Sequence, residues 1–173
     1  MNTNSEREAS ERTRSASFMP SEKIEDFDEK LIGFIKKYAP FANSAAVFTV
    51  FFWFGILKVM NMSPADMIVK DLLLKIWPSV PFSSFFIFLG VYEMILGVLF
   101  IIPKGERIAL PFLFVHMATT FLPLFLLTDS VWQGPFSPSI EGQYIIKNLI
   151  IIALALNVAA GLAPIKKRAS VIS

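Results

Sequence analysis

Four long apolar stretches dominate the sequence and restrict what the chain can fold into. Each is close to the roughly 20 residues that an α-helix needs to cross about 30 Å of hydrocarbon. They cover residues 41–60, 82–102, 108–127 and 144–162. The sequence therefore predicts an all-α integral membrane protein. Because successive spans alternate in direction, we expect an antiparallel four-helix bundle within residues 40–165.

The composition agrees with a membrane protein. Hydrophobic residues make up 54% of the 173 residues and charged residues only 17%, which is little charge for a soluble domain of this length. The net charge of +2 is small and scattered, so it does not indicate a nucleic-acid surface. The chain contains no cysteine and has no thiolate chemistry of its own, so any redox role needs a borrowed cofactor.

The N-terminal forty residues differ from the rest. Residues 1–20 are rich in Ser, Glu and Arg, and they contain too few apolar side chains to hold one conformation, so we expect a disordered tail. In residues 21–39, apolar side chains recur at helical spacing between charged ones. This pattern predicts an N-terminal interfacial amphipathic helix, lying in the membrane interface and ending at Pro40.

A second surface helix is expected between the first two spans. Ser63, Pro64 and Asp66 follow the order of an N-cap, a proline at the start of a helix and an acid in its first turn. A short apolar face follows and ends near Trp77. The connection therefore predicts a short helix at the membrane surface.

The distribution of Lys and Arg predicts the orientation of the spans. Residues 128–143, which connect the last two spans, contain neither residue type. The N-terminal segment, the connection between the second and third spans, and the C-terminal tail are all basic. The last two of these carry Lys104, Arg107, Lys166, Lys167 and Arg168. Since basic connections stay on the cytoplasmic side, we expect both termini in the cytoplasm.

Four ionisable side chains lie within the predicted spans, where each charge costs about 2.5 to 3.5 kcal/mol on insertion scales. They are Lys58, Glu93, His116 and Lys147. With a rise of about 1.5 Å per residue, Glu93 and His116 both lie about 12 to 14 Å above the cytoplasmic boundary. The two lysines lie about 22 to 26 Å above it. Glu93 and His116 therefore share a level in the membrane.

We expect Glu93 to be protonated or paired, because no interface is within reach of its side chain. His116 is the nearest candidate partner, and Lys58 is the second. Either lysine can instead extend to the outer headgroups, where Glu141 is a possible partner for Lys147. The hypothesis is a polar centre that is functional or fixes the structure; the alternative is an incidental, uncharged glutamate.

The surroundings of this centre suggest neither a metal nor a defined catalytic site. His116 is the single histidine, and one His with one Glu makes an incomplete metal site. Thr119 and Thr120 lie on its helical face as hydrogen-bonding candidates. Small residues and amides indicate close helix packing and cross-helix hydrogen bonds. These are Gly90, Gly97, Ala155, Ala159, Asn148 and Asn157.

Aromatic residues cluster in the first span. Such a cluster can line a flat ligand such as a quinone, or it can serve packing and lipid contact. The residues are Phe48, Phe51, Phe52, Trp53 and Phe54.

Three segments resemble a known family. They are Trp53 to Lys58, Tyr92 to Gly97 followed by Ile101 to Pro103, and Ile140 to Asn148. Together they resemble the YkgB-like family of bacterial inner-membrane proteins, of the reactive-chlorine-resistance type, which is similar to the wider DoxX group. The similarity covers residues 39–162, and the stretch from Glu141 to Asn148 is its most specific part.

The resemblance implies a four-helix protein of the bacterial inner membrane, linked in some members to oxidative or chlorine stress. DoxX relatives are associated with quinone-linked sulfur oxidation. No catalytic motif carries over. The polar positions of the matching motifs are occupied by Lys58, Glu93, Glu141, Lys147 and Asn148.

Three functions are open on this basis. The first is a quinone- or lipid-associated component of a stress response, acting as a binding module or as a subunit beside a membrane or redox partner protein. The second is a proton-coupled transporter or channel-like homo-oligomer that uses Glu93 and His116. The third is a structural membrane partner whose charges only fix helix register. The sequence does not decide whether the protein is an enzyme.

Overall fold

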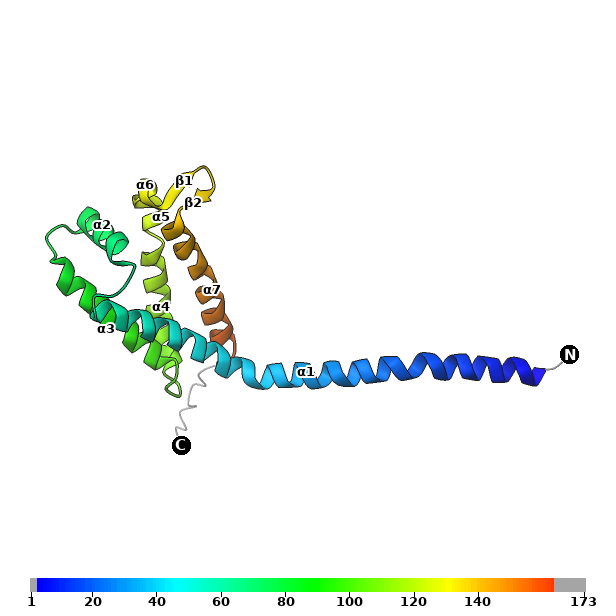
Figure 1. Ribbon diagram of the computed structural model, residues 1–173. Coiled ribbons are helices and arrows are strands. Elements are labelled where there is room, and N and C mark those ends of the chain that lie inside the picture. The colour runs from blue at the N-terminus through cyan, green and yellow to red at the C-terminus, as the bar shows by residue number, and fades with distance from the viewer. Residues whose placement is uncertain (1–2, 164–173) are drawn as a thin grey trace, which may run out of the picture. The chain divides into compact units, whose positions relative to one another are not determined.

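The computed structural model describes residues 3–163, with side chains described from Glu22 onward. The basic C-terminal tail, from Lys166 to Arg168, lies outside the described residues. The chain divides into two compact units, residues 1–40 and 41–173. Its elements are α1 (Thr3–Val59), α2 (Asp66–Ile76), α3 (Phe82–Leu99), α4 (Glu106–Thr120), α5 (Pro123–Leu126), α6 (Thr128–Val131), β1 (Trp132–Gly134), β2 (Ser137–Pro138) and α7 (Ile140–Ala160) (Figure 1).

Four helical segments among the described residues are long and apolar enough to cross a membrane. They are Glu22–Val59, Phe82–Leu99, Glu106–Leu126 and Ile140–Ala160. These segments confirm the all-α class and fit a multi-pass membrane protein. The third consists of α4 and α5, which meet at Phe121 and Leu122, because Pro123 starts a new helix at its first position.

The N-terminal region differs from the sequence prediction. Helix α1 begins at Thr3 and continues through Pro40 to Val59, whereas the sequence predicted a disordered segment over residues 1–20 and a helix end at Pro40. Low apolar content excludes a packed core, but the Glu, Arg and Ala residues of this segment have high helix propensity. An interior proline costs about 3 kcal/mol, because it removes one N–H donor and its ring clashes with the carbonyl four residues earlier. The long helix α1 nevertheless continues through Pro40.

The core of the second unit lies between α3, α4, α7 and residues 41–59 of α1. Helix α4 packs against both α3 and α7. Ala109 on α4 and Ala155 on α7 are fully buried, so small side chains lie within the core, as expected for Ala155. The buried cluster consists of Val47, Phe51, Leu96, Phe100, Ala109, Leu110, Leu113, Met117 and Ala155.

The connections on either side of these helices are ordered. The predicted surface helix is present as α2, and Lys75 in its last turn donates a hydrogen bond to the carbonyl oxygen of Leu126 at 2.5 Å. Between α6 and α7 the two short strands form an antiparallel hairpin, which no pattern in the sequence predicted. The Trp132 indole N–H fixes the start of the hairpin by donating to the Leu124 carbonyl oxygen at 3.0 Å.

Candidate functional site

Lys58 and Glu93 form a buried ion pair between α1 and α3. Lys58 lies in the last turn of α1, and its Nζ lies 2.5 Å from Oε2 of Glu93 in the middle of α3. Their side chains are only 7% and 9% exposed. Of the two alternatives for Lys58, the structure therefore shows the inward one, in which the lysine stem runs toward Glu93.

His116 on α4 completes this group. Its Nε2 lies 3.3 Å from Oε1 of Glu93, and its side chain is 6% exposed. The predicted pairing of Glu93 with His116 is thus confirmed, although Lys58 is the closer partner. Each carboxylate oxygen of Glu93 contacts a different basic side chain. We call Lys58, Glu93 and His116 the charged cluster.

Two glycines explain how Lys58 reaches Glu93. A Cβ atom added to Gly55 or to Gly90 would lie 2.6 Å from the carbonyl oxygen of the other residue, so the two backbones are in direct contact. A Cβ atom on Gly90 would also lie 2.9 Å from Cβ of Lys58. The missing side chain at Gly90 therefore leaves room for the lysine stem to run along α3 to Glu93, one turn further on.

Gly97 is a second point of close approach on the same face of α3. A Cβ atom on Gly97 would lie 3.0 Å from the backbone nitrogen of Phe52 and 3.1 Å from the carbonyl oxygen of Phe48. The packing role expected for Gly90 and Gly97 is confirmed. Gly55, their counterpart on α1, was not singled out, although it lies in the motif that ends at Lys58.

Aromatic rings enclose the histidine end of the charged cluster. The ring centroids of Phe51 and Tyr92 lie 5.7 and 5.5 Å from that of His116. The Tyr92 hydroxyl donates to the carbonyl oxygen of Phe112 at 2.9 Å, which fixes this ring against α4. Thr119 was expected as a hydrogen-bond partner of the His116 side chain, but its hydroxyl donates to the backbone carbonyl oxygen of His116 at 2.7 Å. The imidazole is therefore held by rings and by Glu93.

The remaining predicted site residues lie apart from the charged cluster. Glu141 accepts a hydrogen bond from the Ser139 hydroxyl at 2.7 Å, next to the N-cap of α7. Lys147 is exposed, and within the described residues it lies 5.0 Å over the Tyr144 ring instead of pairing with Glu141. Asn148 takes part in a contact between α7 and α4, outside the cluster.

Polar side-chain contacts connect each of the four long helices to two of the others. The charged cluster links α1 to α3 and α3 to α4. Asn148 donates to the Thr120 hydroxyl at 3.4 Å, linking α7 to α4. Asn157 accepts from the Asn43 side chain at 2.8 Å, linking α7 to α1. The cross-helix hydrogen bonds expected for Asn148 and Asn157 are confirmed.

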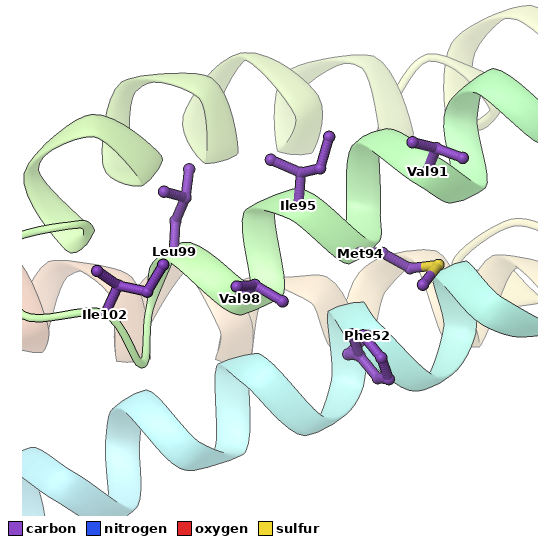
Figure 2. A pocket seen from close by; sticks show the side chains of 7 residues that line it. All are labelled: Phe52, Val91, Met94, Ile95, Val98, Leu99 and Ile102. Atoms are coloured by element: carbon purple, nitrogen blue, oxygen red, sulfur yellow. The ribbon is translucent and has the colours of Figure 1, made fainter.

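An apolar groove of about 380 Å³ lies along α1 and α3 (Figure 2). Its lining contains no polar side chain and consists of Phe52, Val91, Met94, Ile95, Val98, Leu99 and Ile102. At about 100° per residue, Val91, Ile95 and Val98 lie on the face of α3 opposite Glu93. The groove is therefore separated from the charged cluster by the body of α3.

The predicted aromatic cluster divides among several environments. Phe52 lines the groove, and the Phe48 ring stacks on the Phe52 ring with a centroid distance of 5.2 Å. Phe51 is buried in the core, whereas Trp53 and Phe54 are exposed. The five aromatics therefore do not form one ligand-binding surface.

Comparison with family models, with curated proteins and with solved structures finds no match for this chain. The resemblance to the YkgB-like family stays a prediction. In the described part of the chain, the side chains of His, Asp and Glu also form no group of three or more that could hold a metal ion.

Proposed function

We propose that the chain is a small protein of the bacterial inner membrane that associates with a lipid or a quinone, as a component of an oxidative or reactive-chlorine stress response. The observation that best supports this proposal is the groove along α1 and α3. Its wholly apolar lining suits a hydrocarbon or isoprenoid chain. Because no lining side chain can donate a hydrogen bond, the polar headgroup would lie outside the groove.

The proposed architecture is an antiparallel four-helix bundle with both termini in the cytoplasm. The polar contacts between α1 and α3, α3 and α4, α4 and α7, and α7 and α1 support a bundle. The basic connection between α3 and α4, with Lys104 and Arg107, supports a cytoplasmic location for that end.

The first test blocks the groove with a large side chain. Val98→Trp places an indole in the lining, so the apolar chain loses its space. We expect the lipid or quinone that is extracted with the purified protein to fall roughly tenfold, a loss of about 1.4 kcal/mol. The measurement is mass spectrometry of the small molecules that remain bound in mild detergent.

Val115→Trp is the matched control, because Val115 on α4 is 64% exposed and does not line the groove. This variant should retain the bound molecule at the level of the unchanged protein. Equal retention by both variants, or an unchanged protein that carries no lipid or quinone after purification, contradicts the proposal.

A second candidate function is proton transfer at the charged cluster. It is favoured by the position of Glu93 between two basic groups, since a carboxylate that contacts both Lys58 and His116 can pass a proton between them. Four helices are few for a pore, so we propose that such a function requires an oligomer.

Proteoliposomes that contain a pH-sensitive dye test this second function. We expect proton flux above that of empty vesicles. Glu93→Gln should reduce this flux to the empty-vesicle level, because a side-chain amide, unlike a carboxyl group, does not bind and release a proton near neutral pH. Glu141→Gln makes the same chemical change outside the cluster and should leave the flux unchanged. A flux from the unchanged protein no greater than that of empty vesicles rules this function out.

A further inference from the structure

The helical segment of the first unit carries a regular apolar seam. Successive seam residues are separated alternately by three and four positions, which is the spacing of heptad positions a and d. The seam residues are Ile24, Phe27, Leu31, Phe34 and Tyr38. All five are exposed within the chain, from 44% for Leu31 to 67% for Ile24 and Phe27. Five large apolar side chains in one row require a covering surface.

We propose that the seam pairs with the same seam of a second copy, as a parallel two-stranded coiled coil. In this arrangement each seam side chain inserts between four residues of the facing helix. Phe34 and Tyr38 already lie one above the other, with ring centroids 4.6 Å apart, so together they present a continuous aromatic surface. A second copy satisfies the heptad spacing along the whole seam.

The charges beside the seam select the parallel orientation. With Ile24 at position a, the g positions are Lys23, Lys30 and Lys37, and the e positions are Asp28 and Ile35. In a parallel pair, a g residue faces the e residue five positions further along the other chain, which places Lys23 opposite Asp28 of the second copy. An antiparallel pair would instead bring g lysines together.

The same charges disfavour the membrane surface as the covering partner. Helices that lie on an anionic leaflet carry a polar face rich in Lys and Arg. Residues 22–39 carry four lysines and five acids. One of these lysines, Lys30, is already paired with Asp26 at 2.7 Å on the flank of the seam. A second copy of the chain therefore fits the segment better than the interfacial location that the sequence predicted.

Because the chain contains no cysteine, single cysteines can map the contact in the full-length protein. We use membrane vesicles in which the N-terminal side is accessible and oxidise them with copper phenanthroline. Phe27→Cys, Leu31→Cys and Phe34→Cys should each give several-fold more disulfide-linked dimer than Glu29→Cys and Lys36→Cys. The last two lie at position f, on the outer face of the proposed pair.

Charge reversal provides a test that leaves the seam intact, with Leu31→Cys as the reporter in every variant. Asp28→Lys should lower dimer formation several-fold, because Lys23 of one copy then faces a lysine. Adding Lys23→Asp to Asp28→Lys should restore it, whereas Lys36→Asp should change nothing.

Two results would overturn the proposal. One is equal cross-linking at the seam and at position f, or no cross-linking at any position. The other is protection of the seam cysteines from a water-soluble maleimide without cross-linking, which would identify the membrane surface as the partner. Neither result bears on the groove, and the proton-transfer proposal requires an oligomer but not contact through this seam, so this proposal and those in the preceding section fail separately.

Discussion

Replacing Glu93 with leucine is expected to destabilise the protein by about 3 to 5 kcal/mol, the usual cost of removing one partner from a buried ion pair. Lys58 and His116 would then both lose their acceptor inside the helical unit. The measurement is the free energy of unfolding by denaturant in detergent micelles. Because Glu93 holds both basic groups, we expect this to be the largest effect of any single substitution in the cluster.

The double variant Lys58→Met/Glu93→Leu should recover most of the lost stability, because it leaves no unpaired lysine. A double-mutant cycle with Lys58→Met gives the coupling energy between the two side chains. Lys147→Met is the matched control, since Lys147 is exposed, and it should change the stability by less than about 0.5 kcal/mol. If Glu93→Leu costs no more than Lys147→Met, the charged cluster does not hold the helices together.

The sequence predicted the contact between Glu93 and His116 because that prediction needed only helix rise. Two side chains at the same depth in neighbouring spans have few partners other than each other. The direction of the Lys58 stem could not be predicted in this way, because it depends on the distance between α1 and α3. That distance is set by the contact of Gly55 with Gly90, and no spacing within a single span reveals which glycines meet.

The start of α7 could not be predicted from hydropathy alone. The predicted fourth span began at residue 144, whereas the helix begins at Ile140. Because Glu141 and Gln143 are polar, the sequence placed them in the loop before the fourth span, although they lie in the first turn of α7. Ser139 was the available signal: its hydroxyl accepts a hydrogen bond from the Gly142 N–H at 3.2 Å, as an N-cap residue does.

The groove could not be predicted from composition. Aromatic residues drew attention to the first span, but only Phe52 of the five lines the groove, and the other lining residues belong to α3 and the turn after it. The shape of a groove between two helices depends on where their backbones approach. Here both glycines of α3 that contact α1 lie beside Glu93, on the face turned away from Val91, Ile95 and Val98.

Gly90→Ala is expected to destabilise the protein by about 1 to 3 kcal/mol, the usual cost of adding a methyl group to a filled core. The new Cβ atom would lie 2.6 Å from the backbone oxygen of Gly55 and 2.9 Å from Cβ of Lys58. A backbone oxygen cannot rotate away as a flexible side chain can, so α1 and α3 must separate. The same unfolding measurement checks this result. Gly33→Ala is the control, because no atom lies within 4 Å of a Cβ atom there, and alanine should stabilise that helix by up to about 1 kcal/mol.

The separation of α1 from α3 has a further consequence for the charged cluster. Gly90→Ala should lengthen the contact of 2.5 Å between Lys58 and Glu93, so part of its cost is the weakening of that ion pair. In the Lys58→Met/Glu93→Leu background the pair is already absent, and Gly90→Ala should therefore cost less there than in the unchanged protein. An equal cost in both backgrounds would show that the glycine contact and the charged cluster stabilise the helices independently, and the close approach at Gly90 would then no longer explain how Lys58 reaches Glu93.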